Sequence, residues 1–262
     1  MIGWSQRFTC LLAMAALSTA GPVYGEEAVS ATTSITARKV DTFVHPLTRT
    51  IEFATSRADY IRQNILDYTC RLIKRERIDG ELQPLQCANV KVRSEQRQGD
   101  EVVKPLAVFM QFLAPKSIKD RRVLFIEGQN DGKVLVRKGG NLMKHVKLTI
   151  DPHGSAARRE SNYPITEVGF DKVVARLIDR VSNDIRRDPK GENTSVSYFR
   201  NAKVGKRKCT HIRVTHPEPI GEMEYHIASL YVDDELQVPI RLIVYGWPQE
   251  KDSKPPLLEE YA

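Results

Sequence analysis

The chain has 262 residues, of which 28% are charged, and its formal net charge is +7 at pH 7. No run of about 20 apolar residues occurs anywhere in it, which excludes a chain that crosses a bilayer repeatedly through helices. The basic residues fall in short clusters without interleaved aromatic side chains, so a nucleic-acid partner is not expected. A solvated surface is the default interpretation of these clusters, and attraction to anionic lipid or polymer is the alternative.

The first 25 residues are typical of a cleavable secretory signal. Arg7 precedes an apolar run from Phe8 to Leu17, and small residues follow, with Val23 and Gly25 just before Glu26. The run is too short for a membrane anchor. We therefore expect an exported protein, periplasmic or extracellular, whose mature chain begins near Glu26. Cleavage would remove one basic and no acidic residue, so the net charge falls from +7 to +6.

Residues 26–42 are rich in Ala, Ser and Thr and lack periodicity, which predicts a flexible segment before the folded part. We expect residues 43–262 to form a single β-rich domain. Its first element is an amphipathic helix, because apolar residues recur at alternating spacings of four and three from Leu47 to Ile65.

A series of strands then follows with a period of two. The first strand ends at Asp79-Gly80, a strong signal for a two-residue hairpin turn, and Pro84 marks a bulge or an edge in the return strand. The return strand and those after it are predicted at 81–93, 106–113, 123–127, 133–138 and 142–150.

A second amphipathic helix is predicted at 167–186, and four more strands at 195–203, 208–216, 223–232 and 236–247. Their short connections indicate an antiparallel sheet. The predicted fold class is therefore mainly β (α+β): a curved antiparallel sheet or half-barrel covered by two amphipathic helices.

Motifs of known catalytic chemistry are missing from the sequence. It contains no Gly-x-Ser-x-Gly, no His-Glu-x-x-His, no phosphate-binding loop and no dinucleotide fingerprint. Cys70 lies in a predicted strand, where a packed or disulfide-bonded cysteine is favoured over a nucleophile. We therefore expect a protein that is not an enzyme and needs no cofactor.

One group of residues contains side-chain types that bind metal ions. It comprises His211, His216 and His226 with Asp233 or Asp234. His211 and His216 are five residues apart, so on one strand they would point to opposite faces. Ordinary surface histidines are favoured over a metal site.

Three cysteines remain after signal cleavage, which in an oxidising compartment suggests one disulfide and one thiol. A bond between Cys70 and Cys209 would close a loop of about 140 residues and stabilise by about 4–5 kcal/mol. The competing pair is Cys70 with Cys87, which a two-residue turn would place diagonally on one face, at about 7 Å or more.

Several segments carry a family resemblance. They are Tyr68–Gly80, Phe112–Pro115, Leu124–Lys133, Cys209–Pro217, and Val232–Arg241 continuing to Pro248. Over about residues 45–261 the chain resembles a bacterial exported family, the domain of unknown function 1571. This resemblance favours the Cys70–Cys209 pairing, because both cysteines lie inside the matching segments and Cys87 does not. Family members continue past Glu259-Glu260-Tyr261 into another strand, so we expect this chain to be truncated or to lack a closing strand.

The strand order resembles the LolA-like lipoprotein carriers, in which a curved sheet and a helical lid enclose an apolar cavity. The resemblance implies an envelope protein that binds a lipid or lipidated partner. The alternative is a scaffold that binds anionic polymer or another protein through its basic surface, associating peripherally with the envelope. The residues expected to face the cavity, or else to form a filled core, are Val108, Met110, Phe112, Leu124, Ile126, Val134 and Val136.

Overall fold

The structure is a computed structural model that describes residues 43–139, 146–250 and 253–262. The predicted signal peptide, the predicted flexible segment at 26–42 and part of the strand predicted at 142–150 lie outside the described residues.

Three α-helices and three short 3₁₀ helices are present in the part described. The two long helices are α1 (Thr48–Asn64) and α3 (Phe170–Arg187). The short ones are η1 (Lys116–Ile118), η2 (Asn130–Gly132), α2 (Ser155–Arg158) and η3 (Ile165–Glu167). Both long helices coincide with the two predicted amphipathic stripes.

Fourteen strands alternate with these helices in the described residues. The first nine are β1 (Asp67–Ile78), β2 (Glu81–Leu82), β3 (Gln86–Arg93), β4 (Gln96–Gln98), β5 (Glu101–Lys104), β6 (Ala107–Ala114), β7 (Arg122–Ile126), β8 (Val134–Arg137) and β9 (Lys147–Ile150). The last five are β10 (Ser195–Val204), β11 (Arg207–Thr215), β12 (Ile227–Asp233), β13 (Pro239–Tyr245) and β14 (Leu257–Tyr261).

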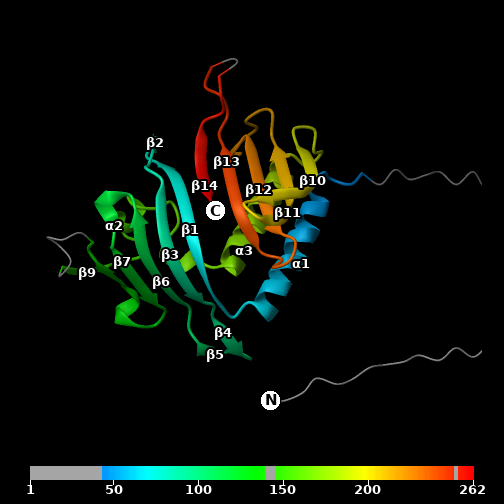
Figure 1. The fold of residues 1–262 in the computed structure, drawn as a ribbon. Helices are drawn as coiled ribbons and strands as arrows, with labels where there is room; N and C mark the ends of the chain where they lie inside the picture. Colours follow the sequence, from blue (N-terminus) through cyan, green and yellow to red (C-terminus); the bar gives the residue numbers. More distant parts are fainter. Residues whose placement is uncertain (1–42, 140–145, 251–252) are drawn as a thin grey trace, which may run out of the picture. The chain divides into compact units, whose positions relative to one another are not determined.

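One large sheet contains all strands except the β4–β5 hairpin. Its order is β10-β11-β12-β13-β14-β1-β3-β6-β7-β8-β9, with β2 paired to β1, and every pairing is antiparallel. Figure 1 shows that the sheet curves and stays open, with β9 and β10 at its edges. The predicted class, a curved antiparallel sheet covered by helices, is confirmed.

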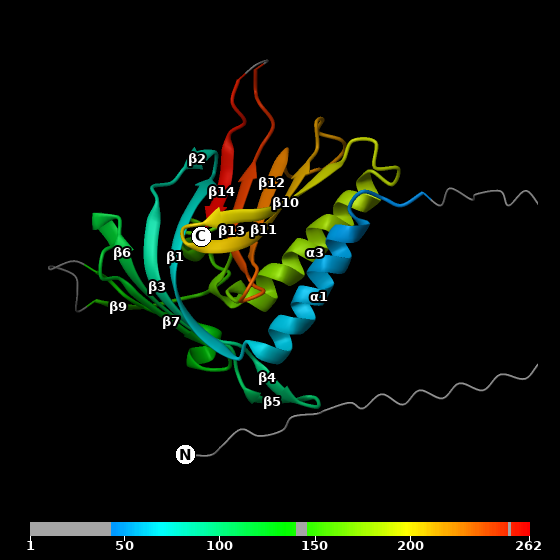
Figure 2. The same cartoon turned by 45° about the vertical axis from the view of Figure 1, so that its right-hand side comes forward.

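The helices α1 and α3 lie side by side against one face of the sheet (Figure 2). Ala58 and Ile61 of α1 pack with Val174 of α3 and with Val238 beside β13, all at most 6% exposed. Acidic Asp171 in the first turn of α3 and basic Arg186 and Arg187 in its last turn also suit the helix dipole.

The predicted turn at Asp79-Gly80 is present. Both residues have positive φ, and Ile78 pairs with Glu81 across the turn. Between β2 and β3 the return strand contains one residue more than β1 does over the same length. The register of β3 is therefore shifted by one, so that Lys74 pairs with Gln86 and Cys70 with Val90. A bulge of this kind moves every later side chain of the strand to the other face.

Two features were not predicted from the sequence. The β4–β5 hairpin lies off the main sheet, and β14 inserts between β13 and β1 near its middle. The β14 sequence, Leu-Leu-Glu-Glu-Tyr, carries two adjacent carboxylates and does not alternate between apolar and polar residues. The residues that were expected to precede a missing strand therefore form a central strand of the sheet.

Apolar packing divides into clusters on the helix-covered face. One cluster, built on β3, β6, β7 and β8, includes Val108 at 0% exposed and Phe125 at 3%. Another joins Leu47 before α1 to Val181 of α3 and to Val214 and Val244 of the sheet. Within the described residues no helix is both long and apolar enough to span a bilayer.

Candidate functional site

The inner face of β1, β3, β6, β7, β8 and β9 forms the floor of a cavity. Directly opposed residues form two rows across these strands. One row is Leu72, Ala88 and Phe112, and the other is Cys70, Val90, Met110, Val123, Val136 and Leu148. Period-two alternation places every member of these rows on the same side of the sheet.

A strap, defined as residues 151–169 and containing α2 and η3, crosses above this floor. It contributes Pro152, Ala157, Ile165 and Val168, and the first turns of α3 add further apolar side chains. At one end the ring of Phe170 stacks on Tyr68 of β1, with centroids 4.3 Å apart. The cavity, which is open to solvent on part of its surface, has a volume of about 750 Å³ and a mostly apolar wall.

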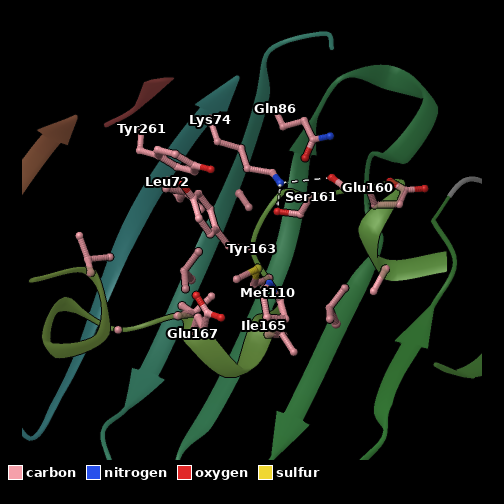
Figure 3. A pocket seen from close by; sticks show the side chains of 18 of the residues that line it. Leu72, Lys74, Gln86, Met110, Glu160, Ser161, Tyr163, Ile165, Glu167 and Tyr261 are labelled. Atoms are coloured by element: carbon pink, nitrogen blue, oxygen red, sulfur yellow. Dashed lines mark hydrogen bonds between the residues drawn. The ribbon is translucent and has the colours of Figure 1, made fainter. Parts of the chain in front are cut away.

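Polar groups gather where the strap meets β1 (Figure 3). The Lys74 ammonium donates to Glu76 Oε2 at 2.7 Å, to Ser161 Oγ at 3.0 Å and to the Glu160 carbonyl at 3.3 Å. Arg121 adds an ion pair to Glu160 at 3.0 Å. These contacts tie the strap to the sheet and make this end of the cavity polar.

Two buried carboxylates lie behind this polar end. Glu76 of β1 and Glu259 of β14 are register partners, and they are 2% and 4% exposed. Glu76 accepts hydrogen bonds from Lys74, Ser161 and Tyr261. Because both carboxylates are surrounded by donors, their charges are compensated inside the protein.

Glu259 has its own donors from the strap and from α3. Tyr163 donates to Glu259 Oε2 at 2.8 Å, and Arg180 pairs with Oε1 at 3.2 Å. Burial, followed by the Glu259 charge, raises the pKa of Tyr163 to about 12. Tyr163 therefore remains a protonated donor at physiological pH, and it holds the strap to β14.

Only some of the predicted cavity residues line the cavity. Met110, Phe112, Val134 and Val136 do so. Val108 is on the same face but is fully buried in the floor. The members of the set that the structure places elsewhere are Leu124 and Ile126.

Leu124 and Ile126 lie on the outer face of β7. Leu124 pairs with Phe109, whereas Val123 pairs with Met110 and Phe125 with Val108. Val123 and Phe125 are thus the inward residues of this strand. A short continuous apolar run does not reveal which alternate set points inward, which explains the error. The inward residues Leu72, Ala88 and Val90 and the whole strap were also missed.

The cysteines do not pair in the structure. Cys70, Cys87 and Cys209 are all free, and Cys70 on β1 is separated from Cys209 on β11 by three intervening strands. That separation is about 19 Å at ordinary strand spacing, far beyond disulfide reach. Cys87 pairs with Ile73 on the outer face, so it cannot reach Cys70 either. The predicted Cys70–Cys209 bond is therefore corrected to free thiols.

The histidines considered as metal ligands are mostly buried rather than on the surface. His211 is 6% exposed and stacks flat on Tyr231 at 4.2 Å, and His216 is 0% exposed. In the described ranges, no group of three His, Cys, Asp or Glu side chains could hold a metal ion.

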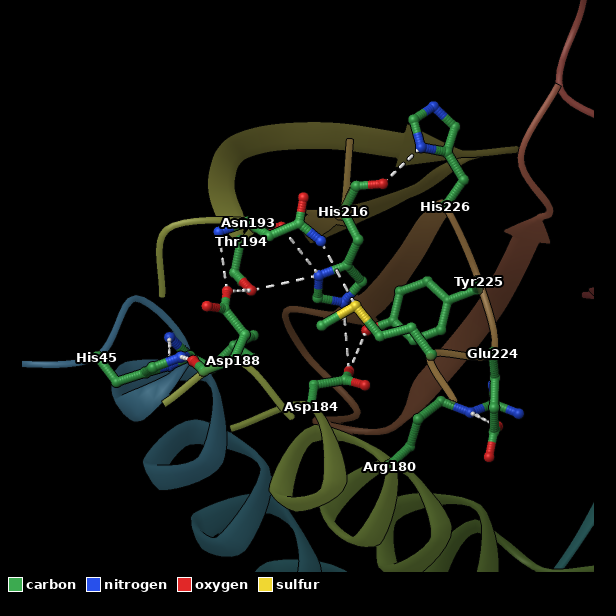
Figure 4. Close-up of polar contacts among 12 residues, drawn as sticks. His45, Arg180, Asp184, Asp188, Asn193, Thr194, His216, Glu224, Tyr225 and His226 are labelled. Atoms are coloured by element: carbon green, nitrogen blue, oxygen red, sulfur yellow. Dashed lines mark hydrogen bonds and ion pairs between the residues drawn. The ribbon is translucent and has the colours of Figure 1, made fainter. Parts of the chain in front are cut away.

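His216 belongs to a buried polar network that joins α3 to the β11–β12 connection (Figure 4). Tyr225 donates to Asp184 Oδ2 at 2.6 Å, and His216 Nε2 lies 3.4 Å from the same oxygen. On its other side His216 Nδ1 lies 3.3 Å from Thr194 Oγ1. The hydroxyl, imidazole and carboxylate resemble a catalytic triad in kind, but His216 and Asp184 are at most 1% exposed. Their arrangement connects elements and offers no access to a substrate.

Comparison with solved structures finds proteins with a distantly similar fold. One is a LolA superfamily protein from Nitrosomonas europaea, with 10% identity and a TM-score of 0.30 over 80% of this chain and 89% of that one. Another is a DUF1329 family protein from Desulfovibrio piger, with 12% identity and a TM-score of 0.34 over 83% of this chain and 90% of that one. A third is MucB, at 12% identity and a TM-score of 0.45 over 82% of this chain and 57% of that one. One of the three is a LolA superfamily protein, the group that the sequence was expected to resemble, and all three are too distant to carry an argument.

The match to a sequence family is more specific than these structural similarities. Residues 65–262 match the family described as protein of unknown function DUF1571, and the chain belongs to it. A search of curated proteins found no match.

Proposed function

We propose that this protein is an exported, non-enzymatic envelope protein that holds a lipid, or the acyl chain of a lipidated partner, in the cavity beneath the strap. The observation that carries the proposal is the cavity itself. Its volume of about 750 Å³ lies within the range of small-molecule sites, and its wall is mostly apolar. A space of this size lined by Val, Leu, Met and Phe favours an apolar guest over water.

The polar end of the cavity would set the orientation of a bound lipid. Apolar chains would fill the space over Met110 and Val123, and a headgroup would meet Lys74, Ser161 and Tyr163. The strap contributes to both ends, so its displacement from the sheet would open the cavity for loading.

Native mass spectrometry of the purified protein tests the proposal. We expect co-purified lipid, at one molecule per chain, to be released on unfolding. The Leu72→Trp variant should obstruct part of the cavity and retain less of this lipid, while Ile73→Trp, at the neighbouring outward position, should retain it. Equal retention by the two folded variants would contradict a cavity ligand.

Export is tested separately. We expect secreted or periplasmic material to begin near Glu26 by N-terminal sequencing. Recovery of exported protein that still carries Met1 would overturn the assignment of a cleaved signal.

A further inference from the structure

The outer face of the same half of the sheet carries an ordered arrangement of charge. Two neighbouring rows of directly opposed residues cross six strands, β1, β3, β6, β7, β8 and β9. The basic row is Arg71, Asn89, Gln111, Arg122, Arg137 and Lys147. The second row, called the apolar row for its central Phe109, Leu124 and Leu135, is Thr69, Lys91, Phe109, Leu124, Leu135 and Thr149.

The basic row places like charges beside one another. Arg122 pairs directly with Arg137, and Arg137 pairs with Lys147, an arrangement that destabilises a sheet in isolation. Neither row contains an acidic residue. Across the described ranges, Arg71, Arg122 and Lys147 form no ion pair with an acidic side chain, and all three are exposed.

Protection of a sheet edge explains only part of this pattern. A lysine on edge strand β9 discourages sheet-to-sheet pairing, which accounts for Lys147. Arg122 lies on β7, two strands in from the edge, where no such protection is needed. The adjacent row also exposes apolar surface, with Leu135 at 36% and Leu124 and Phe109 half-buried.

We propose that these two rows form a docking surface for a bilayer rich in anionic phospholipid. The basic row would contact phosphate groups, and the apolar side chains beside it would enter the boundary between headgroups and acyl chains. A soluble polyanion would satisfy the cations but not the apolar row, which is why the membrane is favoured. Six strands span about 24 Å, wide enough to contact several headgroups at once.

Alternation places this surface on the opposite face of the sheet from the cavity floor, and Arg71 is its only residue that also borders the cavity. The proposal therefore goes beyond the proposed function and does not depend on it. A failure of vesicle binding would leave the cavity proposal untouched, and a dry or filled cavity would leave the docking surface untouched.

Vesicle co-sedimentation of the mature protein provides the test. We expect binding to phosphatidylcholine vesicles that contain about one-third phosphatidylglycerol, weaker binding at about 0.5 M than at about 0.1 M salt, and little binding to phosphatidylcholine alone. Each removed positive charge should lower the affinity for these vesicles about fivefold, so the double variant Arg122→Gln/Lys147→Gln should bind about 25-fold more weakly.

The matched control is Lys203→Gln/Lys208→Gln. These lysines are also exposed, and they are register partners on β10 and β11 at the other end of the sheet. The control removes the same net charge and should weaken binding less than about threefold. Equal loss in the two double variants would show an effect of net charge alone and overturn the proposal, as would absence of a preference for anionic vesicles.

The apolar row separates a membrane from a polyanion. We expect Leu135→Gln to weaken vesicle binding while leaving binding to soluble polyphosphate unchanged, with the fold checked by circular dichroism. If Leu135→Gln leaves vesicle binding unchanged while Arg122→Gln/Lys147→Gln abolishes polyphosphate binding, the surface is a polyanion site and the membrane proposal is wrong.

Discussion

At the scale of single residues, Val108 and Ile126 show the consequence of facing inward or outward. Val108 is 0% exposed in the cavity floor, whereas Ile126 lies half-buried on the outer face. We expect Val108→Asp to lower the free energy of unfolding by about 3 kcal/mol or more, because an unpaired charge would be buried. Ile126→Asp should cost about 1 kcal/mol or less. Urea unfolding of both variants measures the difference, and equal costs would contradict the assigned faces.

Cys70 offers a direct probe of the cavity. Its thiol lies in the cavity wall, and burial raises its pKa. We expect a small neutral maleimide to label Cys70 more slowly once lipid fills the cavity, and to label it faster as the pH rises, because the thiolate is the reactive form. Cys87, on the outer face of the neighbouring strand, is the internal control and should show no protection by lipid in peptide mapping.

At the scale of elements, Lys74 joins the strap to the first strand. Its ammonium compensates Glu76, which is 2% exposed, and bonds two strap residues. Lys74→Met should therefore lower the free energy of unfolding by about 3 kcal/mol, since it leaves a buried carboxylate without its cation. Lys133→Met, at an exposed position, is the control and should cost less than about 0.5 kcal/mol. Similar chemical denaturation curves for the two variants would disprove this role.

The hydrogen bond from Tyr225 to Asp184 connects α3 to the β11–β12 connection. Removing the hydroxyl in Tyr225→Phe should destabilise by about 2–3 kcal/mol, because Asp184 is 1% exposed and loses its short donor. Tyr231→Phe is the matched control, since the Tyr231 hydroxyl bonds no residue of the described ranges. Thermal unfolding of both variants would reveal the difference, and a neutral Tyr225→Phe would refute the connecting role.

At the scale of the whole molecule, one buried and three partly buried tyrosines predict loss of stability at alkaline pH. Burial is the main cause that raises the pKa of Tyr68, Tyr163, Tyr225 and Tyr261 above 10, with Tyr163 at about 12. Above pH 10 the unfolded chain releases protons that the folded chain retains. The contribution of these tyrosines to stability should therefore be flat below about pH 9 and then fall by up to about 1.4 kcal/mol per pH unit for each tyrosine.

The contribution of one tyrosine to the slope of stability against pH can be measured with a variant. Tyr163→Phe should reduce it by about a quarter between about pH 10 and 12, since three of the four shifted groups remain. Urea unfolding at a series of pH values measures the slope. A slope no larger than that of one proton would contradict the burial of these hydroxyls.

The sequence by itself determined the local structure of this protein. Helical spacing predicted α1 and α3, Asp79-Gly80 predicted the first hairpin turn, and period-two alternation identified which residues of a strand share a face. These features depend on neighbours a few residues apart, so local physics suffices to predict them.

Only the tertiary structure decided which of the two faces of each strand points inward. A single extra residue between β2 and β3 reversed the position of Cys87, and β7 points Val123 inward instead of Leu124. The insertion of β14 depends on Arg180 and Tyr163, which lie about 80 and 96 residues away along the chain and neutralise Glu259. The cavity, the strap and the buried histidines likewise arise from contacts between distant segments, which a pattern of nearest neighbours cannot encode.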